Sequence, residues 1–191
     1  LIERTDKLKV GDGLDPEVEV GPLASKAQFE MVTRYIGIGT EEGANLLYGG
    51  RAMSGGIYDE GYYVEPTIFT EMDPSMRIAR EEIFGPVLTV FKAESLEDAV
   101  DISNDVDFGL SSSVYTRDLT RAFEYVNKAE TGMVHVNAPT LGGEVHLPFG
   151  GLKSSGTGNR EQGTEAVEFF SELITVYIDY ADAATQQAKF I

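Results

Sequence analysis

The order of strands and helices predicted in the middle of the chain constrains its fold most strongly. The compact apolar run Val87–Phe91 is typical of a strand buried in a parallel sheet. Ser95 and Asp118 each precede a segment with apolar residues at helical spacing, so each predicts a capped helix start. Residues 110–115 and 133–136 predict further strands. Because strands and helices alternate, we expect an α/β fold with a mostly parallel sheet and flanking helices.

The helix that Asp118 begins carries four apolar residues at helical spacing. Residues at this spacing share one side of a helix, and that side normally packs against the core. We therefore expect four side chains to point inward: Leu119, Ala122, Phe123 and Val126.

The first third of the chain predicts a helix followed by a short strand. Ser25 offers an N-cap to a segment whose apolar residues recur at helical spacing. The glycines Gly37, Gly39 and Gly43 predict the end of this helix. Residues 45–48 then predict a strand.

The C-terminal region predicts a helix, a strand and a tail. Residues 164–170 are typical of a helix, and residues 174–180 alternate apolar and polar side chains, as a half-exposed strand does. We expect residues 1–172 to form one unit, residues 173–180 to form a strand, and residues 181–191 to be a tail without a clear pattern.

The residue types that are scarce exclude several classes of site. The chain contains no cysteine, which excludes a disulfide scaffold, a thiolate metal site and thiol chemistry within these residues. Its two histidines, His135 and His146, lack the spacing of a zinc site, so we expect no metal centre. No apolar run is long enough to span a bilayer, so we expect no membrane partner.

The charge balance is strongly acidic, with 32 acidic against 15 basic residues and a net charge of −17. Such a surface repels phosphate backbones, so we expect no nucleic-acid partner. The acidic residues are scattered and form no tail. This pattern is typical of an acidic cytoplasmic protein, and the small number of basic residues favours a halophilic one, in which salt screens the self-repulsion.

Residues 81–87 carry the most informative local pattern, since two glutamates precede an aromatic residue and a Gly-Pro turn. A carboxylate beside a turn can accept two charge-assisted hydrogen bonds from a vicinal diol such as that of ribose. An aromatic side chain two residues away can pack against a flat ring. A pair of glutamates at a strand entrance is also typical of a solvated turn, so the residues alone leave both interpretations open.

Residues 148–158 are rich in glycine, which allows close backbone approach and suits a loop that lines a ligand cleft. The stretch is not a phosphate-binding P-loop, because Thr157-Gly158 stands where that motif requires Lys followed by Ser or Thr. Gly37-x-Gly39 is not a dinucleotide fingerprint, because it follows a predicted helix. Plain surface turns remain the alternative for both clusters.

Five stretches taken together resemble the aldehyde dehydrogenase superfamily. They are Gly61–Thr67, Glu81–Val87, Val136-Asn137, Pro148–Gly156 and Ile174–Tyr177. They occur in the family's order and at its approximate spacing, and the resemblance covers essentially residues 1 to 180. The chain is thus similar to the C-terminal part of the family's catalytic domain. Residues 136–140 together with residues 144–149 are most similar to the branch that oxidises α-ketoglutarate semialdehyde.

The resemblance implies the oxidation of an aldehyde to a carboxylic acid, with NAD or NADP as acceptor.

 The substrate class that it implies is a semialdehyde. In this family a cysteine thiolate attacks the aldehyde, the resulting thiohemiacetal gives a hydride to the nicotinamide, and water hydrolyses the thioester. By the same resemblance, Glu82 holds the nicotinamide ribose hydroxyls and Phe84 packs beside the nicotinamide. The implied substrate pocket is lined by Phe149 and shaped by the loop from Pro139 to Leu147, which includes Thr140. For His146 two interpretations stay open, a substrate contact and a surface histidine of that loop.

The family's nucleophilic cysteine, general-base glutamate and oxyanion-hole asparagine have no counterpart here, because all three lie upstream of the position that matches Leu1. We therefore expect no catalytic residue in this chain, which would be an incomplete dehydrogenase and inactive alone. Asn137 and Lys153 match family motif positions that we interpret as structural supports. In a full-length form, residues 173–180 would join a sheet shared between the subunits of a homo-oligomer.

Two other hypotheses stay open at this point. The chain could be a non-catalytic assembly or regulatory module that pairs with an intact dehydrogenase through its terminal strand. It could also be a solvated acidic globule without a ligand. The absence of cysteine is compatible with each of them.

Overall fold

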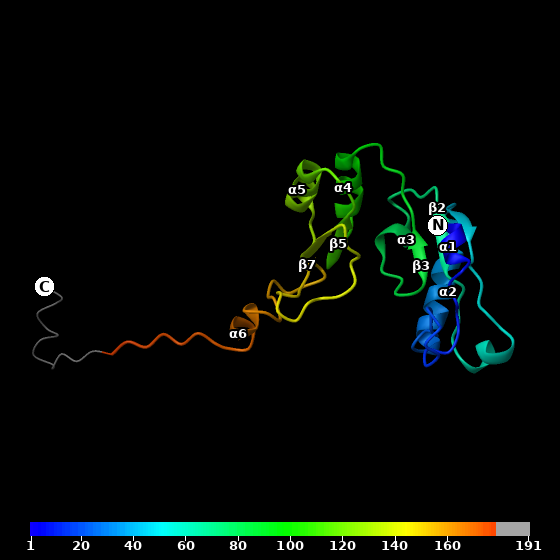
Figure 1. Ribbon diagram of the computed structural model, residues 1–191, viewed down its shortest axis with the longest axis horizontal. Coiled ribbons are helices and arrows are strands. Elements are labelled where there is room, and N and C mark those ends of the chain that lie inside the picture. The colour runs from blue at the N-terminus through cyan, green and yellow to red at the C-terminus, as the bar shows by residue number, and fades with distance from the viewer. Residues whose placement is uncertain (179–191) are drawn as a thin grey trace, which may run out of the picture.

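The computed structural model describes residues 1–178 and arranges them as two lobes (Figure 1). The first lobe contains α1 (Ile2–Thr5), α2 (Lys26–Glu41), β1 (Asn45–Tyr48), the 3-10 helix η1 (Gly56–Glu60), β2 (Thr67–Thr70), α3 (Arg77–Arg80) and β3 (Val87–Thr89). The second lobe contains α4 (Leu96–Asn104), β4 (Phe108–Gly109), β5 (Ser111–Val114), α5 (Leu119–Lys128), β6 (Met133–Val136), β7 (Leu152–Lys153) and α6 (Glu165–Phe169).

Helices and strands alternate as expected, and the α/β class is confirmed. In the second lobe, β5 and β6 are parallel neighbours joined through α5, which is the predicted βαβ unit. In the first lobe the sheet order is β1-β2-β3, with β2 parallel to β3 and antiparallel to β1. The short strands β4 and β7 are antiparallel.

The strand pairing differs from the expected mostly parallel sheet. Strand β3 pairs with β2 in the first lobe and not with β5, so the described strands form three small sheets. The ladder continues before β3, because the Thr67 amide donates to the Pro86 carbonyl at 2.8 Å. This pairing ties the Gly-Pro turn of the predicted cofactor motif directly to the buried strand β2.

Helix α2 begins where predicted but ends later. The Ser25 hydroxyl accepts a hydrogen bond from the Gln28 amide, which is the expected N-cap. The helix runs through Gly37 and Gly39, so the prediction that these two residues end it was wrong. Gly39 faces the core, where a Cβ atom would lie 2.5 Å from the side chain of Ile78. This glycine therefore serves close packing and not helix termination.

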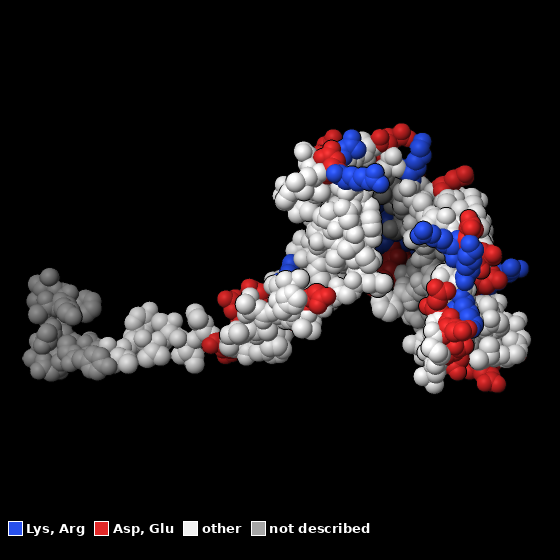
Figure 2. All heavy atoms as spheres, in the orientation of Figure 1, with Lys and Arg blue, Asp and Glu red and all other residues white. Residues whose placement is uncertain are grey.

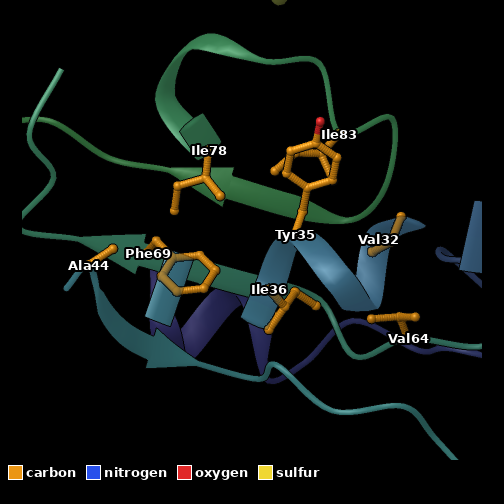
Figure 3. Packing of buried hydrophobic residues seen from close by; sticks show 8 residues of the cluster. All are labelled: Val32, Tyr35, Ile36, Ala44, Val64, Phe69, Ile78 and Ile83. Atoms are coloured by element: carbon orange, nitrogen blue, oxygen red, sulfur yellow. The ribbon is translucent and has the colours of Figure 1, made fainter. Parts of the chain in front are cut away.

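The core of the first lobe lies between α2, β2 and the segment that follows α3 (Figure 3). Val32 and Phe69 are fully buried at its centre. The buried cluster consists of Val32, Tyr35, Ile36, Ala44, Val64, Phe69, Ile78 and Ile83. Ile83 belongs to the 81–87 motif, so this motif is anchored in the core and is not a freely solvated turn.

The orientation of α5 corrects the sequence-based expectation. Ala122 and Tyr125 are its buried residues. Leu119, Phe123 and Val126 are instead 71%, 58% and 38% exposed. Apolar spacing identifies a helix with an apolar side, but it does not show which residues meet a neighbour. Helix α5 packs against α4, and Leu119 and Phe123 are left mostly exposed by residues 1–178.

The predicted C-terminal strand is not formed in the described residues. Residues 173–178 are exposed and pair with no other strand in residues 1–178. A strand requires a hydrogen-bonded neighbour, and this part of the chain supplies none. Residues 179 and 180 of that prediction, and the tail 181–191, lie outside the described residues. The predicted helix at 164–170 is confirmed as α6.

On the face shown in Figure 2, charged side chains gather over the first lobe and over α4 and α5 at the top of the second lobe, with acidic and basic groups interspersed. The described stretch that leads away from α6 is largely uncharged in the same view. In residues 1–178, no helix has both the length and the apolar character needed to cross a membrane.

The buried position of Phe69 leads to a stability prediction. We expect Phe69→Ala to lower the free energy of unfolding by about 3–5 kcal/mol, because it removes a buried ring and leaves a cavity. Urea denaturation followed by circular dichroism measures this loss. Phe123→Ala, on the exposed side of α5, is the matched control and should change the free energy by no more than about 0.5 kcal/mol. Equal effects of the two substitutions would contradict the assignment of the core.

Candidate functional site

The segment of residues 81–86, called here the 81–86 turn, leads from α3 into β3. Its first residue, Glu81, is held by two neighbours: the Tyr35 hydroxyl donates to it at 2.5 Å and the Arg77 guanidinium donates to both of its oxygens at 2.9 and 2.8 Å. The hydrogen bonds from Arg77, and then that from Tyr35, lower the pKa of Glu81 to about 2. Glu81 is therefore a structural carboxylate that anchors the turn.

The second carboxylate of the pair has a different environment. Glu82 is exposed, and its side chain forms no hydrogen bond or ion pair with any residue in 1–178. It borders two cavities between the lobes, of about 490 and 530 Å³. Six hydroxyl side chains line the smaller one: Ser103, Ser111, Ser112, Thr131, Ser154 and Ser155. Glu82 thus offers a carboxylate acceptor to a ligand in a cleft that these hydroxyl groups line.

Phe84 presents an aromatic ring on a strained backbone. Its φ of +54° lies in the left-handed region, and its side chain is 75% exposed. This conformation costs a residue with a side chain about 1–3 kcal/mol, so neighbouring contacts must stabilise it. The side-chain amide of Gln28 supplies such contacts, since its Nε2 donates to the carbonyls of Ile83 at 3.0 Å and Phe84 at 2.6 Å. An exposed ring held in this way is a candidate ligand contact.

The next residue of the turn explains why glycine is needed there. A Cβ atom on Gly85 would lie 2.5 Å from the Cγ2 atom of Val32 in α2. Any side chain at this position would push the turn away from the helix. The sequence Phe-Gly-Pro therefore combines an exposed ring with a backbone that packs directly on α2.

The predicted substrate residues are only partly brought together. Pro139 and Phe149 both line a cavity of about 530 Å³ beside β6. Phe149 is fixed by two backbone hydrogen bonds with Glu161, of 2.6 and 2.8 Å. Thr140 and His146 are exposed on the same loop but do not line this cavity. The structure also places Glu82 and Phe149 at separate cavities.

Two side chains near these sites were not identified from the sequence. His135, in β6, borders the cavity of Phe149, and its Nδ1 atom lies 3.3 Å from the Ser112 carbonyl. The position of His135 in a predicted strand near the Gly-rich loop could have indicated that it borders this cavity. Gln28 was overlooked because its spacing after Ser25 is typical of helix capping, which predicts a local role.

Asn137 and Lys153 both serve the fold, as expected. The Asn137 side chain accepts from the Thr116 amide and donates to the Thr116 carbonyl, at 2.9 Å each. The Lys153 ammonium donates to the Val106 carbonyl at 3.1 Å and forms an ion pair with Glu130 at 2.7 Å. Both residues have a positive φ, and these contacts stabilise that conformation.

Comparison of the sequence with known proteins points to one family. The pattern of the aldehyde dehydrogenase family matches residues 1–176. A betaine aldehyde dehydrogenase of Mesorhizobium japonicum is 46% identical over 185 residues, which are 97% of this chain and 38% of that protein. The alpha-ketoglutaric semialdehyde dehydrogenase of Bacillus subtilis is 44% identical over 178 residues, which are 93% of this chain and 36% of that protein.

A solved structure gives the same result. The betaine aldehyde dehydrogenase of Staphylococcus aureus, crystallised in complex with NAD⁺, superposes with a TM-score of 0.83 at 31% identity. The match covers 94% of this chain and 37% of that one. The chain belongs to the aldehyde dehydrogenase family. It spans 36–38% of the length of the two curated relatives.

The hydrogen bonds of Glu81 lead to a titration prediction. Its pKa is lowered from 4.5 to about 2, so its contribution to stability is present above pH 4.5 and is lost as the pH falls through about 2. We expect Tyr35→Phe to raise this pKa, because it removes one donor. Carboxyl ¹³C NMR titration measures both values. Tyr125→Phe, a buried tyrosine in the second lobe, should leave the pKa of Glu81 unchanged; titration of wild-type Glu81 near 4.5 would contradict the account.

Proposed function

We propose that this chain supplies the nicotinamide-facing and aldehyde-facing side of an NAD- or NADP-dependent aldehyde dehydrogenase active site. The observation that carries the proposal is that the two glutamates of the 81–86 turn have different environments. Glu81 is committed to Tyr35 and Arg77, while the neighbouring Glu82 has no partner in residues 1–178. Phe84 is exposed on a backbone that the rest of the lobe holds in a strained conformation.

The properties of Glu82 and Phe84 fit a nicotinamide nucleotide. A carboxylate with free acceptor positions can hold the two hydroxyls of a ribose, and each hydrogen bond is charge-assisted. An exposed phenyl ring can pack against a flat heteroaromatic ring and limit its orientation. When bound, the oxidised nicotinamide supplies the acceptor for a hydride. The role of the chain's own residues is to position that group relative to the aldehyde.

The cavity beside β6 is the proposed aldehyde-facing side. Phe149 and Pro139 provide apolar surface in it. We assign Thr140 and His146, which lie on the same loop, to the rim of this cavity. The substrate class that we propose is a semialdehyde, of the α-ketoglutarate type that residues 136–140 and 144–149 resemble. Support comes from the Bacillus subtilis relative, whose name gives that substrate. The Mesorhizobium japonicum relative, which has a similar sequence identity to this chain, is named for betaine aldehyde.

We further propose that these residues correspond to the C-terminal part of the family's catalytic domain. The order of the motifs from Gly61 to Tyr177 supports this assignment. The family's cysteine nucleophile is not among these residues, since the chain contains no cysteine. Residues 173–180 are the proposed strand of a homo-oligomer, and the acidic surface supports a cytoplasmic, salt-adapted protein.

The missing thiol leads to a direct prediction of activity. We expect the purified 191-residue chain to show no oxidation of aldehydes with NAD⁺ or NADP⁺, because the covalent route requires a thiolate. The measurement is NADH or NADPH formation at 340 nm in a preparation whose mass has been confirmed. Turnover above a heat-denatured control would contradict this expectation.

The role of Glu82 is tested in a complete dehydrogenase chain that includes this sequence together with the family's cysteine. We expect Glu82→Gln to slow hydride transfer roughly ten- to a hundredfold, because a neutral amide takes the place of the carboxylate and the two charge-assisted hydrogen bonds are lost. Single-turnover kinetics separate this step from thioester hydrolysis, which should be unchanged. Glu94→Gln, an exposed glutamate paired with Lys92, is the matched control. Unchanged hydride transfer in Glu82→Gln would contradict the proposal.

A second candidate function is an assembly module that pairs with an intact dehydrogenase. The observation in its favour is the run of exposed apolar residues after α6, which includes Leu173, Ile174 and Val176. This hypothesis predicts that the chain forms a stable complex with a separate, active dehydrogenase subunit. Size-exclusion chromatography of the mixed proteins distinguishes the two functions.

A further inference from the structure

Three side chains on one side of α2 contact the 81–86 turn. Gln28, Val32 and Tyr35 follow one another at the i, i+4, i+7 spacing that places residues on the same side of a helix. Tyr35 binds the first residue of the turn and Val32 packs against Gly85. Gln28 contacts the residues between these two points.

We infer that Gln28 is a positioning residue, which sets the backbone of the turn and thereby the placement of Glu82 and Phe84. This inference rests on the proposed function of that pair. The side-chain amide nitrogen of Gln28 has two hydrogens, so it can donate to the Ile83 and Phe84 carbonyls at the same time.

The geometry explains why these two bonds are decisive for Phe84. The Ile83 carbonyl belongs to the peptide unit before Phe84, and the Phe84 carbonyl belongs to the unit after it. The relative orientation of these two units is what φ and ψ of Phe84 describe. Holding both carbonyls on one donor therefore stabilises the left-handed conformation, with φ of +54°, that this residue adopts.

The sequence pattern around Gln28 favours a different role, which the structure does not show. Ser25-x-x-Gln28 matches a capping box, in which the glutamine side chain reaches back to the N-cap amide. The Ser25 hydroxyl does accept from the Gln28 amide at 3.2 Å. Among residues 1–178, however, the hydrogen bonds of the Gln28 side chain go to the turn and not to Ser25.

The effect of replacing Gln28 can also be separated from an effect on the hydrophobic core. It is half-buried, whereas Val32 and Tyr35 are buried members of the hydrophobic cluster. Replacing Val32 or Tyr35 would disturb folding and function together. Replacing Gln28 by methionine keeps a similar length and volume and removes only the donor.

The first measurement uses the 191-residue chain. We expect Gln28→Met to move the backbone amide NMR signals of residues 83–87 while the signals of β5 and β6 in the second lobe stay in place. Lys26→Met, an exposed substitution in the first turn of the same helix, is the matched control and should leave the turn unchanged. Gln28→Glu, whose carboxylate cannot donate to a carbonyl, should reproduce the effect and replaces Gln28→Met if the latter does not fold. Unchanged signals for residues 83–87 would overturn the inference.

The second measurement uses a complete dehydrogenase chain that includes this sequence. We expect Gln28→Met to slow hydride transfer about ten- to a hundredfold, as misplacement of a reacting group does, with the melting temperature little changed. Because Gln28 acts through the turn that carries Glu82, the two substitutions together should slow hydride transfer by less than the product of their single effects. Effects that multiply would overturn the inference. If Glu82→Gln alone has no effect, the proposed function fails, while the NMR result still decides whether Gln28 sets the turn.

Discussion

Helix α2 packs against β2 and the 81–86 turn, and the rest of the candidate site depends on this contact. Val32 is fully buried between them and leaves no room for a side chain at Gly85. The same helix holds Glu81 through Tyr35. With these points fixed, Glu82 and Phe84 can face the solvent at a defined position even though they lie outside regular secondary structure. Rigid support for an exposed pair is what a binding site needs and what a solvated turn lacks.

The sequence predicts the elements of this fold better than it predicts their surroundings. The caps at Ser25, Ser95 and Asp118 are confirmed because capping depends on residues that are close in the chain. The burial of Phe123 was predicted wrongly, because spacing alone cannot show which apolar side chains meet a neighbour. The expectation that Gly39 ends a helix failed because its contact with Ile78 is not local.

The candidate site shows the same difference between local and distant information. The 81–87 motif indicated a ligand site through its residue types. Only the structure separates the anchored Glu81 from Glu82, which has no partner within residues 1–178. Gln28 could not be assigned from the sequence, since its bonds to Ile83 and Phe84 join residues more than fifty positions apart. For Pro139 and Phe149 the structure supplies a shared cavity, although Thr140 and His146 of the same loop lie outside it.

We propose that the 81–86 turn holds the nicotinamide nucleotide in a complete aldehyde dehydrogenase. A crystal structure of a complete chain that includes this sequence, with NAD⁺ bound, tests it most directly. We expect the Glu82 carboxylate to lie within hydrogen-bond distance, roughly 2.5–3.0 Å, of the nicotinamide ribose hydroxyls, with Phe84 beside the nicotinamide. A structure in which other residues hold this ribose while Glu82 remains in solvent would contradict it.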